Sequence, residues 1–204
     1  MTIVISSTDS YQDCWHPFFS LFHKFIYNID DYKIYLITDN VKYTGHKFVK
    51  TIITSKNGQT IPWADRIKIG LNKIEENSFL FLMDDYFLRA PLNFSIFQLL
   101  NKIIESEQKV GGIRLVPNKN ESKKNDFKIL NKINKFSSYS ASLQPTLWNK
   151  EFLKSILISG ESPWQFELLG TIRTYFYPKT FLVINEQPSN KIYNFPFSGG
   201  IIKG

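Results

Sequence analysis

Two adjacent aspartates, Asp84 and Asp85, are the residues in this sequence best suited to chemistry. They follow directly on the apolar run Phe79 to Met83. Neighbouring carboxylates repel each other unless a cation or a network of donors neutralises them, and a hard divalent cation bridging a diphosphate is the usual solution. The pair therefore predicts a site for Mn²⁺ or Mg²⁺ and a phosphorylated ligand. Two turn-forming acids that cap a loop are the alternative.

The elements around this pair indicate an α/β fold. Residues 79–83 are apolar at every position, which is typical of a central strand covered on both faces. Ligands of such sheets bind at the carboxyl ends of the strands, where the two aspartates stand. Strands are expected at 2–6, 33–38, 47–53, 110–116, 139–147 and 181–184, and helices at 11–29, 62–77, 94–106, 149–158 and from Pro163.

Composition and charge narrow the function classes. The 204 residues are 43% hydrophobic with a single cysteine, which predicts one domain over 1–204 in a reducing compartment. We expect a cytoplasmic protein, because no export leader or membrane span is apparent. The net charge of +7 predicts an anionic partner, unless it reflects only a compositional bias. Nucleic acid is not expected, since no zinc-finger, RNP or helix-turn-helix pattern occurs.

Three stretches of the sequence form a series that spans most of the chain. Residues 79–88 (FLFLMDDYFL) join an apolar run to the acid pair. Trp63-Ala-Asp-Arg66 precedes them, and Ser142–Trp148 (SLQPTLW) leads through Glu151-Phe152-Leu153 to Glu161–Glu167 (ESPWQFE). In this order the three stretches resemble the motifs of a group of small bacterial glycosyltransferases of the GT-A type, whose strand and acidic motif residues 79–88 match.

The resemblance implies a GT-A-like, mostly parallel sheet flanked by helices and the transfer of a hexosyl group. The donor would be a nucleotide-diphosphate sugar bound by residues 1–90, and the acceptor a glycan or lipid-linked molecule of surface polysaccharide assembly bound by residues 91–204. By this resemblance Asp84 contacts the ribose or diphosphate. Asp85 and Asp84 together bind a divalent metal. The motif is Met-Asp-Asp rather than Asp-x-Asp, and no histidine follows it, which weakens the expectation of tight metal binding.

Four further residues are assigned to the donor site. Thr8, Asp9 and Tyr11 follow the first strand, where this class usually receives the nucleobase, and Asp39 ends the second strand. Ser10 or Asp9 could instead cap a helix.

Arg66 could clamp the diphosphate with its two-pronged guanidinium group. A surface salt bridge to Asp65 or Glu75 is the alternative.

The acceptor side is expected in the last third of the chain. Glu167 is our candidate for the general base that takes a proton from the acceptor hydroxyl, with Glu161 as its rival. Either acid could instead stabilise the start of a helix. Trp164 and Gln144 are placed beside the acceptor, although a tryptophan is more often part of a core.

Other functions remain in competition. A nucleotidyltransferase would need a glycine-rich phosphate loop, but residues 6–14 contain no glycine. A non-catalytic protein that binds nucleotide sugars or nucleic acid is a further alternative. Residues 118–135 are expected to form a basic polar insertion, and residues 197–204 a glycine-rich tail. The lysines of the insertion could hold an anionic acceptor or reach the inner face of a membrane, or could simply be solvated.

Overall fold

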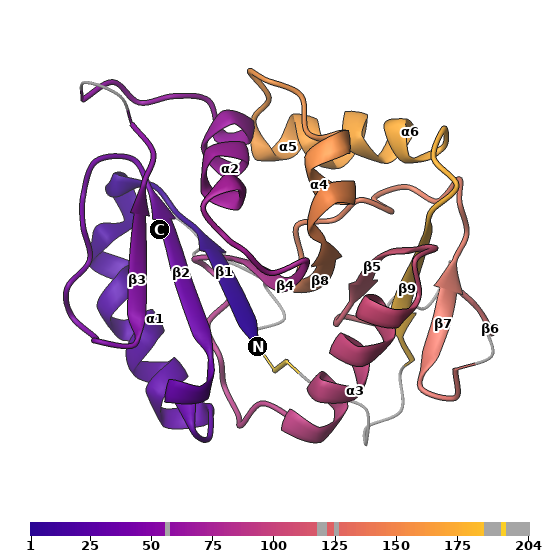
Figure 1. The fold of residues 1–204 in the computed structure, drawn as a ribbon, viewed down its shortest axis with the longest axis horizontal. Coiled ribbons are helices and arrows are strands. Elements are labelled where there is room, and N and C mark those ends of the chain that lie inside the picture. The colour runs from indigo at the N-terminus through magenta and orange to yellow at the C-terminus, as the bar shows by residue number, and fades with distance from the viewer. Residues whose placement is uncertain (56–57, 118–121, 125–126, 186–192, 195–204) are drawn as a thin grey trace, which may run out of the picture.

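The computed structural model describes residues 1–55, 58–117, 122–124, 127–185 and 193–194. Its core is a nine-stranded sheet in the order β3-β2-β1-β4-β8-β5-β9-β7-β6 (Figure 1). The first half consists of β1 (Thr2–Ser6), β2 (Lys33–Thr38), β3 (Val49–Ile53) and β4 (Ser78–Met83), and these four strands are parallel. β1 and β4 pair directly and are buried almost throughout, as their unbroken apolar sequence requires.

The second half of the sheet contains the two strands that run against the others. β8 (Thr146–Asn149) is antiparallel to both β4 and β5 (Val110–Arg114). β9 (Thr180–Ile184) is parallel to β5, and β7 (Leu130–Ile133) is antiparallel to β9 and to β6 (Ser122–Lys124). All described strands except β7 and β8 therefore share one direction, which confirms the mostly parallel α/β sheet.

Helices cover both faces of this sheet. α1 (Gln12–Phe25) and α3 (Phe94–Ser106) pack with one face of β1 and β4, and the buried aromatic rings of α1 lie at three- and four-residue spacings. α2 (Trp63–Asn72) and α4 (Lys150–Ile156) pack on the other face. A last helical segment joins α5 (Pro163–Gln165), a π-helical turn (Phe166–Gly170) and α6 (Thr171–Thr174).

The structure corrects three sequence-based predictions. The helix expected over 62–77 ends at Asn72. The polar insertion expected over 118–135 includes strands β6 and β7. Of the strand predicted at 139–147, only the part from Thr146 on is a strand: Tyr139 has a positive φ, Pro145 has no N–H to donate, and the Ala141 N–H donates to the Thr171 hydroxyl.

Two expectations concern residues outside the described part of the chain. The glycine-rich tail, 197–204, lies there entirely, and so do Lys119, Glu121 and Asp126 of the basic stretch. Within the described part, no helix combines the length and apolar character needed to cross a membrane.

Candidate active site

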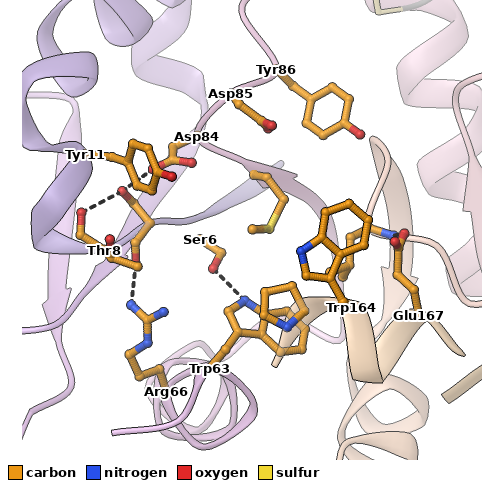
Figure 2. Close-up of a pocket in the computed structure, with 14 residues that line it drawn as sticks. Ser6, Thr8, Tyr11, Trp63, Arg66, Asp84, Asp85, Tyr86, Trp164 and Glu167 are labelled. Atoms are coloured by element: carbon orange, nitrogen blue, oxygen red, sulfur yellow. Dashed lines mark hydrogen bonds between the residues drawn. The ribbon is translucent and has the colours of Figure 1, made fainter. Parts of the chain in front are cut away.

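A cleft of about 320 Å³ opens at the carboxyl ends of β1 and β4 (Figure 2). The parallel pairing of these strands sets Ser6 beside Met83, so the residues that follow them, Ser7 and Asp84, meet at the same edge of the sheet. Residues from α2, the turn after β4 and the segment around α5 complete the lining: Ser6, Ser7, Thr8, Tyr11, Trp63, Arg66, Met83, Asp84, Asp85, Tyr86, Leu143, Pro163, Trp164 and Glu167. The cleft is thus at the position expected for a ligand site of an open α/β sheet.

Asp84 is the buried member of the acid pair. It is 9% exposed and accepts a hydrogen bond from the Ser7 hydroxyl, whose oxygen in turn accepts one from Trp15 Nε1 at 2.6 Å. Burial and, to a smaller extent, the neighbouring Asp85 raise the pKa of Asp84 to about 6, against the opposing effect of the Ser7 hydrogen bond. The site therefore holds a carboxylate that is destabilised at neutral pH.

Asp85 offers an oxygen without a protein partner. Its Oδ1 atom is buried and has no hydrogen bond within the described residues, and burial raises its pKa as well. An unpaired buried carboxylate oxygen beside a second carboxylate matches the oxygen-donor set that Mg²⁺ or Mn²⁺ prefers. These residues fit a divalent cation, although the described residues contain no group of three or more His, Cys, Asp and Glu side chains placed to hold one.

Arg66 supplies the positive charge of this wall. It is 5% exposed, donates through Nη1 to the Ser7 carbonyl at 2.5 Å, and lies 3.2 Å from Asp39 Oδ1. The alternative prediction, a surface salt bridge from Arg66 to Asp65 or Glu75, is therefore wrong. Burial lowers the pKa of Arg66 while Asp39 and Asp84 raise it. Its Nε atom is buried and has no acceptor among the described residues, so it is a donor suited to an anion.

The residues after β1 divide into cleft lining and scaffold. Thr8 and Tyr11 line the cleft, whereas Asp9 does not. The Asp9 carboxylate instead accepts from the backbone N–H groups of Asn40 at 2.9 Å and Val41 at 3.2 Å, which ties the loop after β1 to the loop after β2. The helix-capping role considered for Asp9 or Ser10 is wrong, because neither the short helix at Asp9–Tyr11 nor α1 has a side-chain cap.

The opposite wall carries Trp164 and Glu167, across from the aspartates in Figure 2. Glu167 Oε1 accepts from the Leu143 N–H at 2.7 Å and from the Ser142 hydroxyl at 3.1 Å. Tyr86 lies between the two walls: burial, Asp85 and Glu167 all raise its pKa. One carboxylate is thus fixed in orientation on the wall opposite the aspartates.

Three other predicted site residues lie outside the cleft lining, and one of them, Asp39, pairs with Arg66 behind it. Glu161 is buried and forms a two-pronged ion pair with Arg173, at 2.8 and 2.7 Å. Gln144 bonds through its backbone to Ser142 and Thr146 in the loop before β8. Glu161 is therefore an anchor of the last helical segment, and its role as a rival base is not supported by its position.

Sequence reasoning missed three lining residues that matter to the site. Ser7 bonds to Asp84, Trp63 donates through Nε1 to Ser6 Oγ at 3.0 Å, and Tyr86 follows the acid pair. Trp63 and Tyr86 belong to the motifs that carried the resemblance, which could have identified them. For Ser7 the sequence contains one signal, its position directly after a buried strand.

The histidines are gathered elsewhere. The rings of His16 and His46 stack with centroids 5.1 Å apart, and His23 lies 6.4 Å from His46. None of the three lines the cleft. The residues that line the cleft thus include carboxylates but no histidine or cysteine.

Comparisons with known proteins support the fold and leave the family open. No protein-family model and no curated protein matches the sequence. Among solved structures, S. aureus TarS 1-349 in complex with UDP superposes with a TM-score of 0.59 at 12% identity, over 91% of this chain and 58% of that one. TarS 1-349 in complex with UDP-GlcNAc gives 0.57 at 13% identity, over 91% and 56%.

The likeness to TarS is one of fold. The chain spans 35% of a longer TarS structure, with a TM-score of 0.57 and 10% identity. At such identities a shared architecture is what the superposition shows, and it confirms the GT-A-like α/β fold expected from the sequence.

Proposed function

We propose that this protein is a glycosyltransferase that moves a hexosyl group from a nucleotide-diphosphate sugar to a glycan or lipid-linked acceptor. The observation that carries the proposal is the cleft with two adjacent carboxylates at the end of β4, the buried Asp84 and the half-buried Asp85, and a fixed third carboxylate on the facing wall. Direct displacement at a sugar carbon needs both features, since the leaving diphosphate must be neutralised and the acceptor hydroxyl must lose a proton.

The donor side is assigned to the wall formed by β1, α2 and the turn after β4. Asp85 and Asp84 would hold a divalent cation, and this ion supplies positive charge against the leaving diphosphate. Arg66 would offer its unpaired Nε–H to the same phosphates. Thr8 and Tyr11 line the part of the cleft next to these groups and would contact the nucleoside. The TarS structures with UDP and UDP-GlcNAc favour a uridine donor of this kind.

The acceptor side is assigned to the segment around α5. Glu167 would take the acceptor proton, because the Leu143 N–H and Ser142 hydroxyl hold one of its oxygens and so fix the direction of the carboxylate. Trp164 lies beside it with 74% of its surface exposed, so its ring is free to stack on a sugar. Glycosyl transfer is favoured over nucleotidyl transfer because the Ser7 N–H already donates to the Ile37 carbonyl and the loop after β1 has no glycine.

The test is ligand-induced thermal stabilisation with a matched pair of variants. Wild-type protein is melted with UDP, GDP and UDP-sugars, with and without Mn²⁺. We expect a nucleoside diphosphate to raise the melting temperature, and Asp85→Ala to remove the metal-dependent part of that rise. Asp30→Ala, which removes an exposed acid distant in sequence from the cleft, is the control.

Equal metal-dependent stabilisation of wild type and Asp85→Ala would contradict the metal assignment. The product then separates the two transferase classes. Release of a nucleoside diphosphate from a sugar donor supports the proposal, whereas release of pyrophosphate from a nucleoside triphosphate would replace it with nucleotidyl transfer.

A further inference from the structure

The last helical segment and the turn after it, residues 163–176, present an apolar face to the outside of the molecule. Four of the exposed hydrophobic side chains are spaced four residues apart and a fifth, Leu169, lies next to one of them; Trp164 and Phe176 at the two ends are 74% and 82% exposed. In Figure 1 the segment through α5 and α6 runs along the top edge of the molecule. We call this set the apolar stripe; its members are Trp164, Leu168, Leu169, Ile172 and Phe176.

Polar groups are nearly absent from the outer side of this segment. Gln165 is the one polar residue of 163–176 whose side chain is exposed. The two charged residues are engaged inward: Glu167 bonds to Ser142 and Leu143, and Arg173 pairs with Glu161 and donates to the Ile156 carbonyl. A helical surface that turns its charges inward and its large apolar side chains outward is suited to an apolar partner.

A lysine-lined pocket lies at the end of the stripe. It has a volume of about 60 Å³, and Lys132, Lys135 and Lys179 line it together with Thr174 of α6. No acidic residue is among its lining residues. Next to Lys135, the 70% exposed ring of Phe136 packs on Tyr175 at 5.1 Å between centroids. Cationic and apolar groups are therefore contiguous on this edge of the molecule.

We propose that the apolar stripe and the lysine-lined pocket form a docking surface for a membrane that contains anionic lipids. Apolar side chains on one helical face enter the boundary between headgroups and acyl chains, while nearby lysines bind the phosphates. A second copy of the chain fits the surface less well. A two-fold contact sets the same patch against itself, which would bring lysines of like charge together on a protein whose net charge is already +7.

The position of Trp164 connects this surface with the cleft, because Trp164 both begins the stripe and lines the cleft. Docking would bring the mouth of the cleft to the lipid surface. The inference about the acceptor rests on the proposed function. The geometry assigns the acceptor to the lipid-linked class, because such an acceptor would reach Glu167 from the plane of the membrane.

Flotation of the full chain with lipid vesicles tests the surface. We expect binding to vesicles of phosphatidylcholine with phosphatidylglycerol, little binding to phosphatidylcholine alone, and weaker binding at high salt. Ile172→Ser with Phe176→Ser should reduce binding about tenfold or more. Lys132→Gln with Lys135→Gln should weaken it by about fivefold for each lysine.

Matched controls come from the opposite end of the fold. Tyr27→Ser removes a ring that is 84% exposed, and Lys42→Gln with Lys47→Gln removes two exposed lysines; neither change should affect flotation. All the substituted side chains are exposed, and a melting curve checks that each variant is folded. If a substitution in the stripe lowers stability, Phe176→Ser alone replaces the double variant.

The outcomes separate the docking surface from the proposed function. Absence of vesicle binding with intact UDP stabilisation would overturn the membrane proposal alone, while vesicle binding without nucleotide stabilisation would overturn the glycosyltransferase and keep the surface. Equal binding by wild type and the stripe variant refutes the surface. A wild-type dimer that Ile172→Ser with Phe176→Ser converts to a monomer also refutes it and makes the stripe a subunit interface.

Discussion

Asp84→Asn should stabilise the protein at neutral pH, and the gain can be worked out from the burial of this carboxyl. Burial raises the Asp84 pKa from 3.8 to about 6. Because one pKa unit corresponds to about 1.36 kcal/mol, ionised Asp84 should lower the free energy of unfolding by up to about 3 kcal/mol. Asparagine keeps the shape and an acceptor for the Ser7 hydroxyl but carries no charge.

The pH dependence has a defined sign. A carboxyl whose pKa is raised in the folded state binds its proton more tightly there, so stability falls as pH rises from about 4 to about 6 and remains lower above that range. The difference in free energy of unfolding between Asp84→Asn and wild type should therefore be near zero at about pH 4, grow as the pH rises to about 6 and level off by about pH 7.

Urea unfolding of both proteins across this pH range gives the difference directly. Asp30→Asn, which changes an exposed acid, is the matched control and should show no such profile. A saturating concentration of Mn²⁺ with UDP should narrow the gap at about pH 8, because the ligand stabilises only a site that retains its acid. If, without ligand, Asp84→Asn is no more stable than wild type at about pH 8, or if its gain in stability does not change with pH, the reasoning is refuted.

Three further substitutions test the cleft and its support. Arg66→Ala leaves Asp39 buried without its cation, so we expect a loss of about 3–5 kcal/mol in the free energy of unfolding by urea titration, together with weaker UDP binding in a titration of the folded protein. Glu167→Gln should lower turnover on a defined acceptor by about 10²–10⁴-fold with donor affinity unchanged; near-normal turnover would exclude this base. Glu161→Gln should weaken the pair with Arg173 and lower the melting temperature, while turnover per folded molecule stays near wild type. A loss of turnover as large as that of Glu167→Gln would contradict this and make Glu161 a candidate for the general base again.

The sequence was sufficient to predict the half of the sheet that carries the acid pair. The strands predicted at 2–6, 33–38 and 79–83 correspond to β1, β2 and β4, because an unbroken apolar run has few stable arrangements other than a strand covered on both faces. The location of Asp84 and Asp85 in a cleft followed from the same pattern, since parallel strands end at one edge.

The strand predicted at 139–147 shows where pattern alone fails. The residue types alternate as in a strand, but Ser140 and Ser142 are as buried as Ala141 and Leu143, so the alternation does not mark a covered and an exposed face. The N–H groups of Ala141 and Leu143 bond to side chains 30 and 24 residues later rather than to a neighbouring strand. In this loop, side chains are buried without strand pairing.

Only the tertiary structure decided what the charged side chains do. Glu161 and Glu167 are six residues apart and look alike in sequence, yet one is neutralised by Arg173 and the other is held at the cleft by Leu143 and Ser142. Arg66 likewise turns away from nearby acids toward Asp39, at the end of another strand. The function of a charge depends on its burial and on its partners, and these partners are brought to it by strand pairing and helix packing between segments far apart in the chain.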